Sequence, residues 1–409
     1  MSEPKKFKRV VTCQGGIQLV AALAALRSCE DDQQRSGCEY AYEDYLVIYD
    51  LYAPHSQLPQ YADAVQRMAQ GLRNWKAIVY FSHEQMVEFD KQLTFATKPQ
   101  VFQRIRELIG ITEPEEVYLC RNWQFGNRLM LNVYRDSWKV CYGDSIGIFF
   151  SEAYFSPAVA NGRPPISAVV TERLRRIKRS LQSRLTGRQT PMTDVVLDEI
   201  DFDIGYFLLP QVLGETPPMK TRLVNKAMTE EIFRKLAGAL DPDEVATRYG
   251  HLSKGPVVIL MTSNFSEAER MSVELEIAAY REFIERLNLP GESTLVIKPH
   301  PRDNEEKIRE LGRAVSDLFS DVVLLTEQNL FFIPFEVFMI QVFLNNGIGN
   351  LKIITFSTAC LSLPILFDID PIIGFGSEIV RKSFFEDYIT GRIRHEHDLQ
   401  VAVQSLGKT

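Results

Sequence analysis

The sequence predicts an α/β protein made of two Rossmann-like domains that face each other across a cleft. Short apolar runs, each typical of a buried strand, alternate with amphipathic helical segments along most of the chain. The chain has 409 residues, whereas one hydrophobic core usually holds no more than about 250–300. A proline-rich and basic stretch at about 156–220 interrupts the alternation and suits an insertion or hinge. We therefore expect one parallel sheet, covered by helices on both faces, in each half.

The apolar and helical patterns place the elements in order. In the first half we expect strands at residues 9–13, 44–49, 77–81, 116–120 and 139–142. In the second half we expect them at residues 256–261, 294–298, 322–325 and 352–356. Helical patterns cover residues 17–26, 61–71, 101–108, 272–287 and 305–319.

The domain boundary is predicted near residue 210. Residues 1–210 would form the N-terminal α/β domain, with a basic helical insertion near 165–190, and residues 211–409 the C-terminal domain. Because ligand sites favour interfaces between domains, we expect the functional residues to face the cleft between them.

Composition excludes several classes of protein. The chain is 45% hydrophobic and 24% charged, as in soluble globular proteins, and its net charge of −7 argues against nucleic-acid binding by the whole surface. The polar N-terminus predicts no signal peptide, and the apolar run at 17–26 is too short to span a bilayer. Six scattered cysteines form no Cys-x-x-Cys pair, so reduced thiols and a cytoplasmic location are expected.

The most informative segment runs from Lys298 to Arg302 and has His300 at its centre. It follows an apolar run at 293–297, and the two prolines around the histidine stop the strand there. In open α/β sheets this carboxyl-terminal edge binds ligands. An imidazole with a reference pKa of about 6.5 could, once protonated, stabilise or protonate a departing phosphate oxygen, and the flanking cations suit phosphate. The alternative is a surface turn with an incidental histidine.

A second candidate is Asp144, in the segment Tyr142–Gly147 after the strand at 139–142. Glycines before and after it let the backbone turn sharply and leave the carboxylate unhindered. Such a carboxylate could take a proton from a hydroxyl nucleophile. The alternative is an ordinary Asx turn.

Three weaker signals also lie at strand ends or helix starts. Ser357 and Thr358 precede a helix, where their hydroxyls would make an anion site or simply cap the helix. Glu336 follows a proline at a helix start, which suits capping or binding of both hydroxyls of a ribose. Ser263 and Asn264 belong to a polar loop after the strand at 256–261, where nucleotide-binding domains usually contact their ligand.

Taken in chain order (the Asp144 segment, the polar loop, the His300 segment, Glu336 and the Ser357-Thr358 pair), these features resemble a bacterial sialyltransferase of the two-domain GT-B type, closest to the α-2,8-polysialyltransferase-like group. That family has an acidic-acidic-Gly motif, a His-Pro motif and a Ser-Ser/Thr motif. The similarity runs from the turn at 13–16 to Ser357 and is strongest at 256–302. The acidic motif differs from the family pattern. Where the family has two carboxylates before a glycine, this chain has Gly143-Asp144-Ser145, with one carboxylate.

The resemblance implies an inverting, metal-independent transfer from a CMP-sugar to a glycan, in the synthesis of surface polysaccharide. Asp144 would deprotonate the acceptor hydroxyl and His300 would assist loss of the CMP phosphate. The implied nucleotide-binding residues are Ser263, Asn264, Lys298, Pro301, Arg302, Glu336, Ser357 and Thr358. Gln14 and Gly15 would belong to the acceptor surface.

Neither a metal nor a dinucleotide cofactor is expected. Asp-x-Asp strings, which chelate divalent ions in another glycosyltransferase class, occur at 201–203, 241–243 and 368–370. They lie in the predicted hinge, in a predicted turn and beyond the Ser-Thr motif. We therefore expect that they match the metal-binding motif by chance. The glycine pairs at 347–349 and 374–376 lack the third glycine of a dinucleotide loop.

A basic amphipathic helix is predicted at 171–190, with Arg175, Arg176 and Arg179 on it. Its charged face is either simply solvated or binds an anionic acceptor or an acidic membrane surface. The protein would then work in the cytoplasm, at the inner face of the plasma membrane.

Two rival functions stay open. One keeps the fold and changes the donor, giving a UDP-sugar transferase or epimerase. The other is a catalytically silent glycan-binding protein, which the single carboxylate at 143–145 keeps in consideration.

Overall fold

The computed structural model describes residues 5–51, 57–95, 97–143, 146–149, 197–209, 216–240, 242–344 and 350–406. Contacts divide the chain into two units. The N-terminal unit comprises Met1–Leu51, Asn74–Gln211 and Glu215–Asn225. The C-terminal unit comprises Tyr52–Arg73, Val212–Gly214 and Lys226–Thr409. The sequence places the boundary near 210 and does not reveal that residues 52–73 join the second unit, where α2 (Leu58–Leu72) packs against α7 (Lys226–Ala239).

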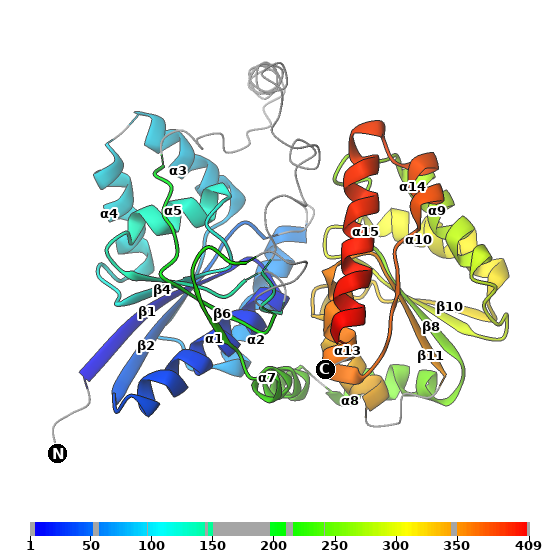
Figure 1. The fold of residues 1–409 in the computed structure, drawn as a ribbon, viewed down its shortest axis with the longest axis horizontal. Coiled ribbons are helices and arrows are strands. Elements are labelled where there is room, and N and C mark those ends of the chain that lie inside the picture. The colour runs from blue at the N-terminus through cyan, green and yellow to red at the C-terminus, as the bar shows by residue number, and fades with distance from the viewer. Residues whose placement is uncertain are drawn as a thin grey trace. The chain divides into compact units, whose positions relative to one another are not determined.

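The N-terminal unit is built on a seven-stranded sheet with the order β3-β2-β1-β4-β5-β6-β7. Figure 1 labels β1, β2, β4 and β6 of this sheet. All its pairings are parallel. Its strands are β1 (Lys5–Cys13), β2 (Tyr40–Ile48), β3 (Ala77–Tyr80), β4 (Glu116–Leu119), β5 (Trp138–Cys141), β6 (Ile204–Phe207) and β7 (Lys220–Leu223). Its helices are α1 (Gly16–Arg35), α3 (His83–Phe95), α4 (Lys98–Ile109) and α5 (Phe125–Val133).

The C-terminal unit is built on a five-stranded parallel sheet with the order β10-β9-β8-β11-β12. Its strands are β8 (Val257–Met261), β9 (Thr294–Lys298), β10 (Asp321–Leu324), β11 (Leu351–Thr355) and β12 (Ile372–Ile373). Besides α2 and α7, its helices are α8 (Pro242–Tyr249), α9 (Val273–Arg286), α10 (Glu305–Val315), α11 (Gln328–Phe331), α12 (Phe335–Met339), α13 (Ser362–Phe367), α14 (Ser377–Ser383) and α15 (Glu386–Leu406). Helix α15, red in Figure 1, packs against α13, α14 and β12.

The central strand β8 shows why this sheet forms. All five of its residues are buried and apolar, the pattern of a parallel strand covered on both faces. One face packs against an aromatic cluster in which the ring centroids of Phe356 and Phe375 lie 4.2 Å apart. The rings of Phe265 and Tyr280 pack against the same two phenylalanines. The cluster fixes the backbone just beyond the ends of β8 and β11.

Each sheet has one point where the strand order reverses. In the N-terminal unit it lies between β1 and β4, and in the C-terminal unit between β8 and β11. Ligands of open α/β sheets bind outside the carboxyl ends of the strands at such a point. The candidate site should therefore lie beyond Met261 and Thr355.

The predicted α/β class with two Rossmann-like domains is confirmed. The strands β6, β7 and β12 were not predicted, and for β7 and β12 the reason is identifiable. All four residues of β7 are exposed and three are polar, so it lacks an apolar run, and β12 has only two residues. Among the described residues, no helix is both long enough and apolar enough to cross a bilayer.

Candidate functional site

The strand ends of the C-terminal unit bring the predicted motifs to one edge. Register pairs Met261 of β8 with Lys298 of β9 on one side and with Thr355 of β11 on the other. Neighbouring strands lie about 4.8 Å apart, so the chain leaves β9 and β11 at points about 10 Å from each other. His300 and Ser357 each follow two residues beyond these points. The three motifs of this unit therefore share one edge, with the reversal point among them.

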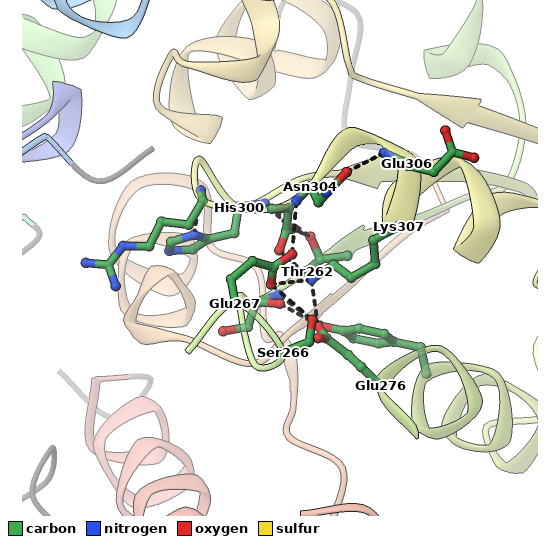
Figure 2. Close-up of polar contacts among 12 residues, drawn as sticks. Thr262, Ser266, Glu267, Glu276, His300, Asn304, Glu306 and Lys307 are labelled. Carbon is green, nitrogen blue, oxygen red and sulfur yellow. Dashed lines mark hydrogen bonds and ion pairs between the residues drawn. The ribbon is translucent and has the colours of Figure 1, made fainter. Parts of the chain in front are cut away.

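His300 is held by its backbone. Its N–H donates to Oγ1 of Thr262 at 3.1 Å and to Oδ2 of Asp303 at 2.8 Å. The Thr262 hydroxyl itself donates to the same carboxylate oxygen. The turn after β9 is thereby fastened to the turn after β8, as Figure 2 shows. The histidine is partly exposed, whereas Thr262 and Asp303 are buried.

The ring of His300 is oriented by one further bond. The backbone N–H of Arg302 donates to Nδ1 at 3.1 Å, so Nδ1 carries a lone pair and the proton of the neutral ring lies on Nε2. Burial lowers the pKa of His300 well below its usual value, and the nearby cations Arg302 and Lys307 lower it further. The geometry favours a neutral ring that donates a hydrogen bond, over the protonated ring considered from the sequence.

A buried ionic cluster lies behind this turn; we call it the Lys307 cluster. The ammonium of Lys307 lies 2.7 Å from Oε2 of Glu267, 3.0 Å from Oε1 of Glu276 and 2.8 Å from Oδ1 of Asp303. Figure 2 shows Glu267 and Glu276 gathered around Lys307. One of these carboxylates also bonds the backbone: Oε1 of Glu267 accepts the N–H of Asn304 at 3.0 Å. The cluster thus fixes the turns after β8 and β9 relative to each other.

The electrostatics of the Lys307 cluster follow from its burial. Burial raises the pKa of Asp303 to about 7, although the Lys307 charge acts in the opposite direction. Burial also raises the pKa of Glu276. For Lys307, burial acts to lower the pKa, but the three carboxylates outweigh it and raise the pKa. Carboxylate oxygens of Glu267, Glu276 and Asp303 lie within 4.8 Å of one another, a donor set suited to a metal ion, and the lysine ammonium contacts all three.

The loop after β8 carries two predicted residues. The backbone N–H of Ser263 donates to the hydroxyl of Tyr280 at 2.8 Å, and the residue is only 8% exposed. Asn264 is partly exposed, and its carbonyl accepts the N–H of Ala268 at 3.0 Å. Of the two, Asn264 is the side chain with access to a ligand from outside.

Ser357 and Thr358 lie where β11 leads into a short 3-10 helix, Thr358–Leu361. The Ser357 hydroxyl accepts the N–H of Ala359 at 3.4 Å, which is the predicted capping contact. Both residues are partly exposed. A hydroxyl in this position can cap the helix and still donate its own proton to an anion.

The side chains of Lys298 and Glu336 are buried more deeply than side chains that contact a ligand directly. Lys298 is 5% exposed and donates to the carbonyl of Phe331 at 2.9 Å, while burial lowers its pKa to about 8. Glu336 is 3% exposed; burial raises its pKa, and a hydrogen bond with Ser362 opposes the rise. The structure thus gives both side chains partners inside the protein. Pro301 and Arg302 are partly exposed, beside the histidine.

Several predicted residues lie outside the described part of the chain. They are Asp144, Arg175, Arg176 and Arg179. Gln14 and Gly15 are described and follow β1 at the reversal point of the N-terminal sheet. Gln14 is 1% exposed, and its side-chain amide donates to Oε1 of Gln124 at 3.3 Å.

The structure shows a local role for two residues of the Asp-x-Asp strings. Asp203 accepts the backbone N–H of Lys139 at 2.7 Å. Asp368 adopts a left-handed conformation with φ of 56° where α13 ends. Asp241 lies outside the described residues.

Sequence reasoning placed Thr262 in the polar loop at 262–267, which it expected to bind CMP, but it missed Asp303 and Lys307. The four-residue spacing from Asp303 to Lys307 is a usable signal, since it is the spacing of an ion pair on one helix face. It also missed Asp50, at the carboxyl end of β2, where burial raises the carboxyl pKa to about 6 while the N–H of Gly126 opposes the rise. Asp50 has a positive φ of 46°, a conformation that short polar residues tolerate.

Comparison with solved structures finds distant likenesses. A UDP-GlcNAc 2-epimerase of Methanocaldococcus jannaschii, in complex with UDP-GlcNAc and UDP, is 12% identical with a TM-score of 0.45, over 99% of this chain and 93% of that one. The N-terminal domain of trehalose-6-phosphate phosphatase from Candida albicans is 8% identical with a TM-score of 0.43, over 99% and 94%. A family 9 glycosyl transferase of Veillonella parvula is 11% identical with a TM-score of 0.33, over 100% and 99%. Comparison with curated proteins gives no match.

A family comparison is more specific. The family model described as alpha-2,8-polysialyltransferase (POLYST) matches residues 166–372, which is just over half of the chain. The matched range includes the loop after β8, the turn with His300, Glu336 and the Ser357-Thr358 pair. The chain therefore belongs to the alpha-2,8-polysialyltransferase family and is a glycosyltransferase with two Rossmann-like α/β domains.

Proposed function

We propose that this glycosyltransferase moves sialic acid, or a related nonulosonic or ulosonic acid, from its CMP conjugate to a glycan hydroxyl. Family membership supports a nucleotide-sugar donor and a glycan acceptor. One observation carries the proposal to the donor: His300 has Nδ1 engaged by Arg302, so its Nε2–H is available to an anion at the strand-end edge. Ser357 and Thr358 supply hydroxyls on the same edge.

The proposed chemistry is a single inverting displacement. The bond between the anomeric carbon and the phosphate oxygen breaks, and both electrons stay with the oxygen of the departing CMP. Hydrogen bonds from His300 Nε2 and from the hydroxyls of Ser357 and Thr358 stabilise this charge as it develops. The acceptor oxygen bonds the anomeric carbon from the opposite face. Its proton passes to a general base, a role that we assign to Asp144 by its family motif.

We propose that no metal ion takes part. Phosphate needs positive charge or hydrogen-bond donors, and this edge has the cations Arg302 and Lys298 behind the neutral imidazole. Full activity in the presence of EDTA is the expected result. Complete loss of activity that added Mg²⁺ or Mn²⁺ restores would contradict this part of the proposal.

The acceptor is proposed to be a surface polysaccharide, made at the cytoplasmic face of the membrane. The basic segment with Arg175, Arg176 and Arg179 would bind an anionic glycan or acidic lipids there. This assignment rests on the charge pattern of the sequence.

The experiment combines nucleotide binding with substitution of His300. CMP should raise the melting temperature of the wild type, and UDP should leave it unchanged. His300→Gln should slow transfer by about 100- to 10,000-fold, because the flexible glutamine amide replaces a ring that the Arg302 N–H holds in place, and its donor is no longer directed at the leaving group. The matched control is His251→Gln, an exposed histidine of the same unit, which should keep full activity. A shift with UDP alone would favour a UDP-sugar enzyme, and full activity of His300→Gln would refute the role of the histidine.

A further inference from the structure

Arg270 is a cation near His300 that has no anionic partner among the residues that the structure describes. It lies in the turn after β8, where its N–H donates to the carbonyl of Phe265 and its carbonyl accepts the N–H of Phe385, both at 2.9 Å. The backbone is thus fixed on both sides. Its side chain is partly buried, and within the described part of the chain its guanidinium makes no hydrogen bond or ion pair.

Two of the side chains whose charges act on Arg270 are also arginines. Burial lowers the pKa of Arg270, and the positive charges of Arg392 and Arg302 lower it further. Arg392 is 6% exposed and bonds Glu396 at 2.7 Å through Nε, while its Nη2 has no hydrogen-bond partner. Glu396 also accepts the backbone N–H groups of Phe375 and Gly376. The Glu396 carboxylate is therefore shared between the Arg392 guanidinium and two backbone N–H groups.

Each of the three arginines follows or contacts a different strand end. Arg270 follows β8 and Arg302 follows β9. Arg392, on α15, donates to the carbonyl of Phe356 at 3.0 Å and so holds the end of β11 just before Ser357. Its guanidinium carbon lies 4.6 Å from the ring centre of Phe265, in the same turn as Arg270. The cations therefore surround the reversal point between β8 and β11.

Such an arrangement costs stability in the absence of a ligand. Positive charges repel one another, and partial burial removes water that would screen them. The chain has 53 acidic against 46 basic residues, so carboxylates are not scarce. A guanidinium that has no partner within the described residues, among like charges at a ligand-binding edge, is suited to binding an anion.

The donor in the proposed function carries two anions, the phosphate and the carboxylate on the anomeric carbon of the sugar. His300, Ser357 and Thr358 are assigned to the phosphate, which leaves the carboxylate. A guanidinium presents two parallel N–H groups that match a carboxylate. We propose that Arg270 binds the carboxylate of the donor sugar and so selects CMP-ulosonates over nucleotide sugars that lack this group. The inference rests on the proposed CMP-sugar function.

The test separates the two anions by using two ligands. CMP has the phosphate alone, whereas a 3-fluoro analogue of CMP-sialic acid, which resists hydrolysis, has both groups. Each is titrated calorimetrically into the wild type and into Arg270→Gln. The variant should bind CMP within twofold of the wild type and the analogue about 10- to 100-fold more weakly, the loss of a charge-assisted contact. Arg270→Lys should fall between the two, since an ammonium keeps the charge and loses the fork.

Retained CMP binding also shows that the variant is folded. The matched control is Arg313→Gln, an exposed arginine of α10 that bonds Glu306 at 3.1 Å, which should change neither affinity. If Arg270→Gln weakened the binding of CMP and of the analogue equally, Arg270 would contact the phosphate. That result would overturn this inference and leave the proposed function intact. Unchanged affinity for both would also overturn the inference. Failure of the wild type to bind CMP at all would overturn the proposed function itself.

Discussion

Each unit of the molecule buries a cation among carboxylates, and the two clusters differ in their place on the sheet. In the N-terminal unit, Arg9 is fully buried, and its Nε lies 2.6 Å from Oδ1 of Asp44; it also pairs with Glu30. Arg9 stands opposite Glu116, the first residue of β4, well before β1 ends. In the C-terminal unit, Lys307 fastens the turns that follow β8 and β9.

The comparison teaches that burial and ion pairing do not by themselves mark a functional site. The Arg9 cluster joins β1, β2 and α1 within the body of the sheet. The Lys307 cluster lies directly behind His300, because Asp303 accepts both the Lys307 ammonium and the His300 N–H. The first should therefore affect stability alone, and the second should affect stability and nucleotide binding together.

The largest expected effect comes from removing either cation. Lys307→Met and Arg9→Met should each lower the free energy of unfolding by about 3–5 kcal/mol, because buried carboxylates lose their partner. Urea unfolding measures this. Lys307→Met should also weaken CMP binding at least tenfold, whereas Arg9→Met should leave CMP affinity unchanged in the folded fraction. Equal CMP affinity in both variants would break the distinction between the clusters.

A smaller effect is expected from the hydroxyls that serve each cluster. Thr262→Val removes the donor to Asp303, and Tyr118→Phe removes the buried donor to Glu116, which lies 2.7 Å away. Each should cost about 1–3 kcal/mol of unfolding free energy, since a buried acceptor loses a bond. CMP affinity should fall in Thr262→Val and recover in Thr262→Ser, which restores the hydroxyl. A fall in CMP affinity with Tyr118→Phe would contradict the comparison.

The smallest effect is a difference in pH dependence between the two strand-end edges. His300 has a lowered pKa, so its contribution to stability is present above about pH 6.5 and is lost as the pH falls and the unfolded chain binds the proton. Asp50 has a pKa raised to about 6, so its contribution is present below about pH 4 and is lost as the pH rises to 6. The slopes should not exceed about 1.4 kcal/mol per pH unit.

The measurement compares the wild type with His300→Gln and with Asp50→Asn by urea unfolding between pH 4 and 8. The wild type should lose stability relative to His300→Gln on acidification and relative to Asp50→Asn on moving from pH 4 to 6. For each pair of wild type and variant, the difference in unfolding free energy is plotted against pH. If the two plots had slopes of the same sign, the charge state assigned to His300 or to Asp50 would be wrong.

The sequence predicts most of the fold because the central strands are continuous apolar runs with polar turns at their ends. It also brings the His300 turn, the loop with Ser263 and the Ser357-Thr358 pair to one edge, since parallel strands end on the same side. It does not predict that α2 belongs to the C-terminal unit, because hydrophobic periodicity does not say which unit a helix covers.

The supporting contacts of the site are also hidden in the sequence. The Lys307 cluster draws Glu267 from a loop, Glu276 from α9 and Asp303 from a turn, and these segments meet only in the folded unit. Glu336 follows a proline at a helix start, as an exposed cap would, but all five residues of α12 are buried. The state of the His300 ring depends on the Arg302 N–H, a backbone contact that no residue pattern reveals.

The central claim is that the edge around His300 and Ser357 binds the phosphate of CMP, and a crystal structure of the protein with CMP tests it most directly. The phosphate should lie within hydrogen-bond distance of Nε2 of His300 and of the Ser357 hydroxyl. A nucleotide bound at the strand ends of the N-terminal unit, or bound with its phosphate away from both groups, would contradict the account.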